Sequence, residues 1–256
     1  MPRIFVTDGS LTPTAASVSI LGEDARHLSL SLRLRAGEEI TLSDGAGYEY
    51  RARLSSLSPT AVEAEILSAE RSLTEIPFSI HLYMGYPKGD KLEFVIEKAV
   101  ELGATAVTPF LSDFCVRRPA AEKTARLGER YTKIAKSAAE QCGRAILPTV
   151  GAPLSFAEML AAARTADVTL FCYEGEGTLP IPEVLAAHPS PVSVAVIVGS
   201  EGGFSREEAA AACAAGCIPT GLGRRILRCE TAPIVALSCL GYHYDFGTSV
   251  EKCLKK

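Results

Sequence analysis

Residues 192–208 read VSVAVIVGSEGGFSREE, and this stretch decides the fold class. Residues 192–198 are apolar at every position except Ser193, as in a parallel strand that is buried on both faces of a sheet. Ser205, followed three residues later by Glu208, forms a capping box that predicts the start of a helix. A buried strand joined by a glycine-rich loop to a helix is one unit of an α/β fold with a mainly parallel sheet.

The same alternation of strands and helices extends over residues 74–256. Strands are expected at residues 79–86, 105–111 and 168–173, and helices at 90–102, at 120–142, from 155 and from 231. Residues 1–73 differ, because apolar side chains recur there with a period of two on either side of a turn at 44–47. The sequence therefore predicts two domains: a small β-rich barrel at 1–73 and an α/β domain at 74–256.

Composition and charge exclude several classes of protein. The 256 residues are 47% hydrophobic and 22% charged, with a formal net charge of −4, which is typical of globular chains and not of disordered ones. No apolar run approaches the ~18 residues that cross a membrane, and the N-terminus lacks the apolar core of a signal peptide. We therefore expect a cytoplasmic protein. The eight cysteines include no Cys-x-x-Cys pair, so we expect reduced thiols and no metal.

Three glycine-rich loops follow predicted strands, at residues 173–177, 199–203 and 221–232. Ligands of parallel sheets bind at the carboxyl ends of the strands, so these loops form the candidate site. The second loop enters a helix whose N-terminus favours an anion, but it has neither the Walker A nor the dinucleotide-binding spacing. Its last two glycines are also compatible with a tight turn that holds no ligand. The third loop carries three arginines and a glutamate, a poor composition for a turn and a good one for a site.

Basic residues gather in two places although the net charge is negative. All seven basic residues within the first 72 are arginines, which suit phosphates and bases, although ten acidic residues accompany them. Eight basic residues against three glutamates lie within residues 117–144. Four of them fall on one face of the long predicted helix: Lys123, Arg126, Arg130 and Lys133. A row of this kind without acidic partners favours binding to a nucleic-acid backbone over an ordinary solvated face.

Residues 198–205, VGSEGGFS, and 222–232, LGRRILRCETA, closely resemble the SPOUT-class family of ribosomal RNA small subunit methyltransferase E. The likeness spans the chain, with further matches in RIF at 3–5, HL at 27–28, LR at 32–33, KGDK at 88–91, EKAVELG at 97–103 and EQCGR at 140–144. Ser200 departs from the pattern, because the family commonly has proline there. The change removes no side chain that the chemistry obviously needs.

The resemblance implies a C-terminal SPOUT α/β domain with a trefoil knot, an N-terminal PUA-like β-barrel for RNA, and a homodimer. It implies methylation of N3 of a uridine in 16S ribosomal RNA of the small subunit, with S-adenosyl-L-methionine held in the knot largely by backbone groups. The residues assigned to the cofactor are Phe171, Tyr173, Glu174, Val198, Gly199, Glu201, Gly202, Gly203, Leu222, Gly223, Ile226, Leu227 and Arg228. Those assigned to RNA are Arg3, Arg33, Arg35, Lys88, Arg126, Arg130, Lys133 and Arg144.

Methyl transfer to N3 removes the N3 proton and places negative charge on the uracil carbonyls, where an arginine can stabilise it. We expect Arg228 in that role, with Glu201 or Glu230 as the candidate base. Solvent is the alternative proton acceptor, and an Arg228–Glu230 ion pair that only fixes the loop is the structural alternative. A bulky side chain at Gly199 or Gly202 is expected to block the cofactor and leave the fold intact.

Two other functions compete with this one. A SPOUT ribose 2′-O-methyltransferase would share the fold, but residues 226–232, ILRCETA, disfavour it. A noncatalytic RNA-binding assembly factor would keep the fold and bind no S-adenosylmethionine, so a titration with the cofactor separates it from an enzyme.

Overall fold

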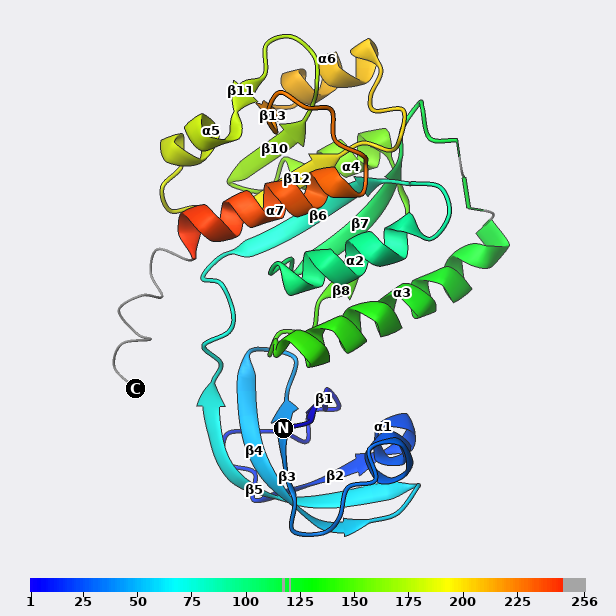
Figure 1. The fold of residues 1–256 in the computed structure, drawn as a ribbon, viewed down its shortest axis with the longest axis vertical. Helices are drawn as coiled ribbons and strands as arrows, with labels where there is room; N and C mark the ends of the chain where they lie inside the picture. The colour runs from blue at the N-terminus through cyan, green and yellow to red at the C-terminus, as the bar shows by residue number, and fades with distance from the viewer. Residues whose placement is uncertain (117, 120, 246–256) are drawn as a thin grey trace. The chain divides into compact units, whose positions relative to one another are not determined.

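The computed structural model describes residues 1–116, 118–119 and 121–245. Arg117, part of the predicted basic stretch, lies outside these residues, as does the side chain of Lys123. Contacts divide the chain into two units (Figure 1). The first comprises Met1–Glu75 and Ala139–Leu147, and the second comprises Ile76–Ala138 and the chain from Pro148 onward.

The first unit is a five-stranded sheet in the order β1-β3-β4-β5-β2. Its one parallel pair joins β1 to β3, and the other neighbours are antiparallel. A short helix and a π-helical turn connect β2 to β3. The elements are β1 (Arg3–Phe5), β2 (Ser17–Leu21), α1 (Gly22–Arg26), η1 (His27–Ser31), β3 (Glu39–Ser43), β4 (Tyr48–Leu57) and β5 (Ala61–Arg71).

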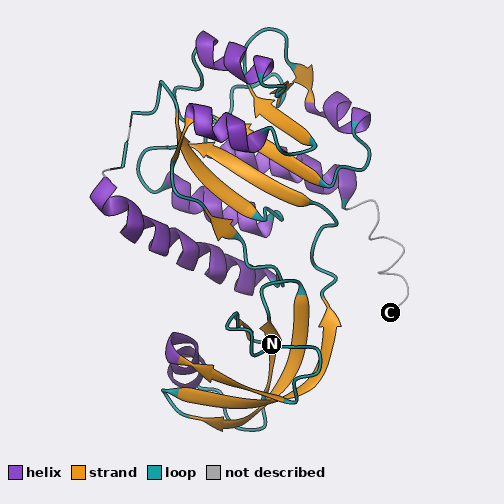
Figure 2. Cartoon of the chain, turned by 180° about the vertical axis from the view of Figure 1, so that it is seen from behind, coloured by secondary structure: helices purple, strands orange, loops and turns teal. Residues whose placement is uncertain are grey.

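The period of two that the sequence predicts is confirmed in β4, where Tyr50, Ala52 and Leu54 are buried and the residues between them are exposed. The sheet is an open half-barrel rather than a closed barrel. Within the described residues no ladder joins β1 to β2, and Figure 2 shows the strands as a curved, open sheet.

The second unit is a sheet in which every pair is parallel, in the order β11-β13-β10-β12-β6-β7-β8, with β9 paired to β7. Its strands are β6 (Ser79–Gly85), β7 (Ala106–Leu111), β8 (Thr149–Val150), β9 (Leu154–Ser155), β10 (Val168–Cys172), β11 (Leu179–Pro180), β12 (Ser193–Val198) and β13 (Ile218–Gly221). Its helices are α2 (Lys91–Glu101), α3 (Ala121–Cys142), whose end belongs to the first unit, α4 (Phe156–Ala163), α5 (Ile181–Ala187), α6 (Arg206–Ala214) and α7 (Thr231–Tyr244).

Helices cover both faces of this sheet (Figure 1). Ala195 and Ile197 of β12 share a core cluster with side chains of α4 and α6. On the other face α7 contacts β12, and α2 packs beside α7. Burial on both faces explains the apolar run at residues 192–198. The trefoil knot that the resemblance implies stays a prediction.

Both predicted capping boxes are present, and they fix where two helices begin. Ser155 precedes α4 and Ser205 precedes α6, and each side chain accepts a hydrogen bond from the backbone N–H three residues later. Over the described part of the chain, no helix combines the length and the apolar character needed to cross a membrane. The same residues contain no cluster of three or more side chains suited to a metal ion.

Candidate functional site

The three predicted loops converge on one cavity of about 700 Å³ in the second unit. They follow β10, β12 and β13, which are neighbours in the sheet, so the carboxyl ends of the strands meet there. The volume falls within the range of small-molecule sites, about 300–1,000 Å³. Of the residues assigned to the cofactor, the following line the cavity: Tyr173, Glu174, Val198, Gly199, Glu201, Gly202, Gly203, Leu222, Gly223, Ile226, Leu227 and Arg228.

Phe171 is a core residue and not part of the cavity lining. Its side chain is fully buried, and its ring centroid lies 4.4 Å from that of Phe204. Side chains alternate across a strand, so the neighbouring Cys172 faces the cavity in its place. Sequence reasoning also missed Lys91 and Ala232, which line the cavity from the first turns of α2 and α7.

Two glycines let the loop after β12 lie close to its neighbours. A Cβ atom at Gly85, the last residue of β6, would collide with the backbone nitrogen of Ser200. A Cβ atom at Gly202 would lie 2.6 Å from the Cβ of Phe114. The Cβ direction of Gly202 therefore points at the Cβ and the backbone oxygen of Phe114. A Gly202→Val substitution would therefore displace the loop, contrary to the expectation that a bulky side chain at this position leaves the fold intact.

Lys91 joins the two glutamates that the sequence offers as candidate bases. Its Nζ lies 3.0 Å from Oε1 of Glu201 and 3.1 Å from Oε2 of Glu230. The third neighbour of the ammonium is the Sγ of Cys229, at 3.7 Å. The backbone N–H of Lys88 adds a hydrogen bond of 3.1 Å to Glu201. One lysine on α2 thus connects the loop after β12 to the segment that leads into α7.

These contacts set the charge states of Glu201, Glu230 and Cys229. Desolvation by itself raises the pKa of Glu201, but hydrogen bonds from the backbone N–H groups of Glu201 and Lys88 and the ion pair with Lys91 lower it below the usual value. Desolvation also raises the pKa of Glu230. The hydrogen bonds from its own backbone N–H and from the Cys229 thiol, together with the ion pair with Lys91, outweigh that effect and lower the pKa below the usual value. Burial and the neighbouring Glu230 raise the pKa of the Cys229 thiol to about 12. Both carboxylates are ionised, and a pKa below the usual value makes them weak proton acceptors.

Within the described residues Arg228 makes no ion pair and its guanidinium makes no hydrogen bond, although Arg228 lines the cavity. Its backbone carbonyl accepts from the N–H groups of Thr231 and Ala232 at 2.8 and 3.0 Å, which begins α7. Glu230 has helical dihedral angles, φ −77° and ψ −21°, and its carboxylate points to Lys91. The Arg228–Glu230 ion pair, which the sequence left as an alternative, is therefore absent.

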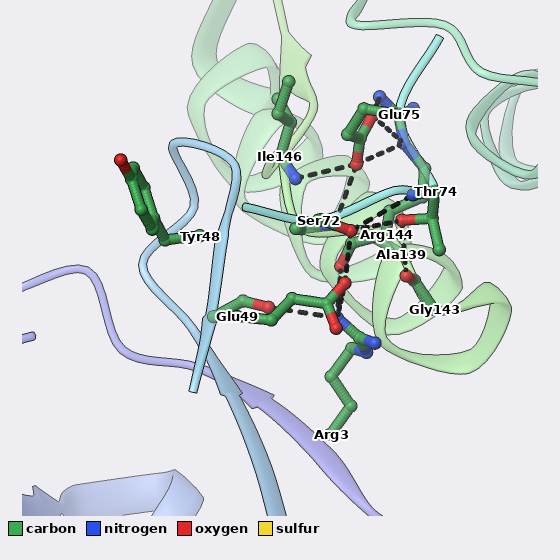
Figure 3. Close-up of polar contacts among 12 residues, drawn as sticks. Arg3, Tyr48, Glu49, Ser72, Thr74, Glu75, Ala139, Gly143, Arg144 and Ile146 are labelled. Atoms are coloured by element: carbon green, nitrogen blue, oxygen red, sulfur yellow. Dashed lines mark hydrogen bonds and ion pairs between the residues drawn. The ribbon is translucent and has the colours of Figure 1, made fainter. Parts of the chain in front are cut away.

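Two arginines assigned to RNA form ion pairs and hydrogen bonds within the first unit, as Figure 3 shows. Arg144 is only 4% exposed, and its Nε and Nη2 donate to Oε2 of Glu75 at 3.1 and 2.8 Å. Arg3 pairs with Glu49 at 3.1 Å and donates to the carbonyl oxygen of Arg144 at 3.3 Å. These side chains attach residues 139–147 to the rest of the first unit, so their contacts favour a structural role for both arginines over the RNA contact that the resemblance implies.

The other arginines and lysines assigned to RNA are exposed. Arg126, Arg130 and Lys133 border a shallow groove on α3, together with Glu129, Ile134 and Ser137. Arg130 has an acidic partner that the sequence did not indicate, because Glu93 of α2 lies 2.7 Å away. Arg130 stays 62% exposed in that pair, so the pair adds little stability. Lys88, Arg33 and Arg35 are also exposed.

Comparison with known proteins adds independent observations on this architecture. Residues 74–241 match the RNA methyltransferase domain, and residues 20–67 match the RNA methyltransferase PUA domain. The ribosomal RNA small subunit methyltransferase E of Bacillus subtilis is 34% identical over 235 residues, which cover 90% of this chain and 92% of that protein. The chain belongs to the ribosomal RNA small subunit methyltransferase E family. It is an RNA methyltransferase of two domains.

Solved structures agree with this assignment. The ribosomal RNA small subunit methyltransferase E of Neisseria gonorrhoeae, bound to S-adenosyl methionine, superimposes with a TM-score of 0.85 at 33% identity over 96% of this chain and 99% of that one. A structure from Legionella pneumophila with the cofactor SAM bound gives a TM-score of 0.82 at 31% identity over 94% of this chain and 96% of that one. The fold class expected from the resemblance is thereby confirmed for the half-barrel and the parallel α/β sheet.

Proposed function

We propose that this member of the ribosomal RNA small subunit methyltransferase E family methylates N3 of a uridine in 16S ribosomal RNA and uses S-adenosyl-L-methionine as methyl donor. The observation that carries the proposal is the cavity at the ends of β10, β12 and β13. Its lining combines residues 198–205 and 222–232, the two motifs on which the resemblance rests. We also propose a homodimer, which is consistent with the apolar Ile234 and Val235 of α7 being only half-buried.

The cavity fits a cofactor that is bound largely through backbone groups. The loop glycines expose N–H and C=O groups to the cavity. The Oγ of Ser200 is buried and has no hydrogen-bond partner among the described residues, although Ser200 lines the cavity. A buried hydroxyl without a partner is costly, so a polar ligand group that pairs with it would be favoured. S-adenosylmethionine supplies an activated methyl group there, and the protein must orient the acceptor.

Arg228 is the residue we propose to act on the base. Its guanidinium has no carboxylate partner, and its planar fork can donate to a uracil carbonyl next to N3. When N3 loses its proton, negative charge spreads to that oxygen, and donors already aimed at it stabilise the transition state. Glu201 and Glu230 are not retained as bases, because their contacts, the ion pairs with Lys91 among them, lower the pKa of both carboxyls. We assign the N3 proton to solvent.

We propose that Arg126, Arg130 and Lys133 contact the RNA phosphates beside the target base. All three lie on one exposed face of α3, where long side chains reach a backbone without desolvating a core. Lys88, Arg33 and Arg35 are further candidates, since each is exposed.

Replacement of Arg228 by Lys tests the proposed chemistry, because it keeps the charge and removes the planar fork. The single-turnover rate at saturating cofactor should fall about 10²-fold, as for the loss of one oxyanion donor. Affinity for S-adenosylmethionine and the melting temperature should change little. Arg164→Lys, at an exposed arginine outside the cavity lining, is the matched control. A wild-type rate in Arg228→Lys would falsify the role of Arg228.

A further inference from the structure

The contacts of Lys91 explain why Arg228 has no ion pair. Arg228 and Glu230 are two residues apart, and a surface glutamate so close to an arginine would ordinarily be drawn to it. Here Oε2 of Glu230 is 3.1 Å from the Lys91 ammonium and accepts a hydrogen bond of 3.2 Å from the Cys229 thiol. Those two contacts hold the carboxylate towards α2, and Glu230 itself does not line the cavity.

Glu201 completes the arrangement. It is the second carboxylate on the same ammonium, at 3.0 Å, so Lys91 separates two negative groups that would otherwise repel each other. The three groups lie on α2, on the loop after β12 and at the start of α7, and their side chains are 20–33% exposed. Pairs at this intermediate depth are screened less than surface pairs.

We propose that Lys91 is a positioning residue for methyl transfer, which holds Glu230 away from Arg228 so that the guanidinium stays available to the substrate. The inference rests on the proposed role of Arg228. Lys91 touches neither the base nor the transferred group in this account. It acts by deciding which cation Glu230 pairs with.

Replacement of Lys91 by Met removes the ammonium and keeps most of the apolar stem. Glu201 and Glu230 then face each other without a cation, and Glu230 turns to Arg228, the nearest cation along the chain. The single-turnover rate at saturating S-adenosylmethionine should fall on the order of tenfold or more, towards the loss expected for Arg228→Lys. Lys91→Arg, which keeps a cation for both carboxylates, should recover most of the rate.

The double variant Lys91→Met/Glu230→Gln separates this role from a purely structural one. It removes the carboxylate that would occupy Arg228, so we expect it to transfer methyl groups about tenfold faster than Lys91→Met alone. If Lys91 only stabilises the loops, the double variant should be slower than Lys91→Met, because the second substitution removes another contact. Calorimetric titration with S-adenosylmethionine measures the cofactor affinity of each variant separately from its rate of methyl transfer.

Lys98 provides a matched control on the same helix. Its ammonium also bridges two carboxylates, those of Glu97 and Glu101, each at 2.8 Å, and its side chain is 32% exposed against 33% for Lys91. Lys98 does not line the cavity, so Lys98→Met should keep the wild-type rate. A comparable loss of rate in Lys98→Met overturns the proposal, because the effect would then come from helix stability.

The assay uses the full-length protein with small ribosomal subunits from a strain that lacks this enzyme. A wild-type rate in Lys91→Met, or a double variant no faster than the single one, overturns the inference and leaves the proposed function standing. Wild-type protein that forms no 3-methyluridine overturns the proposed function itself. If circular dichroism shows Lys91→Met to be unfolded, Lys91→Gln is measured in its place with the same Glu230→Gln partner, and the same outcomes decide.

Discussion

Replacement of Glu75 by Gln should destabilise the first unit strongly, although it changes only one atom. The carboxylate of Glu75 holds Arg144 through Oε2 at 3.1 and 2.8 Å and accepts the backbone N–H groups of Ala145 and Ile146 through Oε1 at 2.8 and 2.9 Å (Figure 3). The glutamine amide keeps one acceptor oxygen and turns its NH₂ towards other donors. Arg144, only 4% exposed, then loses the carboxylate oxygen that accepts from its Nε and Nη2.

The magnitude follows from that burial. Removal of one partner of a buried ion pair costs about 3–5 kcal/mol. For a unit of this size, 1 kcal/mol lowers the melting temperature by roughly 4–8 °C, so the transition of the first unit should fall by at least about 12 °C in calorimetry. Glu75→Gln/Arg144→Met should recover part of the loss, since the buried charge is gone.

Glu39→Gln is the control for this experiment. Glu39 also pairs with two arginines of the first unit, Arg51 at 2.8 Å and Arg53 at 3.0 Å, but those side chains are 56% and 50% exposed. Solvent screens such pairs, so the melting temperature should barely change. If Glu75→Gln melts like the control and instead weakens RNA binding, Arg144 contacts RNA and the structural assignment is refuted.

Three further predictions concern the cavity, the RNA and the pH dependence of stability. Ala232→Phe should fill the cavity from α7 and weaken S-adenosylmethionine binding by about tenfold or more, and unchanged affinity in calorimetry would contradict the location of the site. Replacement of Arg126, Arg130 and Lys133 by Glu should weaken RNA binding and reduce the slope of the logarithm of the RNA-binding constant against the logarithm of the salt concentration by roughly 2–3. Cofactor affinity should not change. An unaltered slope would assign these side chains to an ordinary solvated face. Burial lowers the pKa of His81 from 6.5 to about 4. Between these two pH values the unfolded chain binds a proton at His81 that the folded chain does not bind. The free energy of unfolding should therefore fall as the pH drops from 6.5 to 4, by about 3 kcal/mol in total. His81→Asn should lose that dependence in urea unfolding, and a variant that keeps it would show that another group is responsible.

Features that depend on local periodicity and capping could be predicted from the sequence. The apolar run at 192–198 requires burial on both faces, and it is the central β12 of a parallel sheet. The capping boxes at Ser155 and Ser205 fix the starts of two helices because a side chain and an N–H three residues apart interact within one turn. The three glycine-rich loops meet because parallel strands end at one edge.

Features that depend on distant partners could not be predicted in this way. Lys91 meets Glu201 and Glu230 more than 100 residues away along the chain, and nothing in its own neighbourhood in the sequence indicates which carboxylate it binds. Closure of the barrel depends on whether two edge strands meet, which alternation within each strand does not reveal.

Arg144 illustrates the limit for charged residues. A count of charges does not distinguish a solvated arginine from one that is buried in an ion pair. One signal was available, because Gly143 interrupts the helix before Arg144 and so separates it from the row that ends at Lys133. Phe171 lies outside the cavity lining because adjacent strand positions face opposite sides of the sheet, and Cys172 occupies the side of the cavity.

The position of the transferred methyl group distinguishes methylation of uridine N3 from the competing functions. Purified protein is incubated with small ribosomal subunits that lack the modification and with S-adenosylmethionine that carries a deuterated methyl group, and the RNA is digested to nucleosides for mass spectrometry. We predict that the label appears in 3-methyluridine of the 16S RNA. Label on a ribose 2′-oxygen, or no transfer by protein that binds the cofactor, would contradict it.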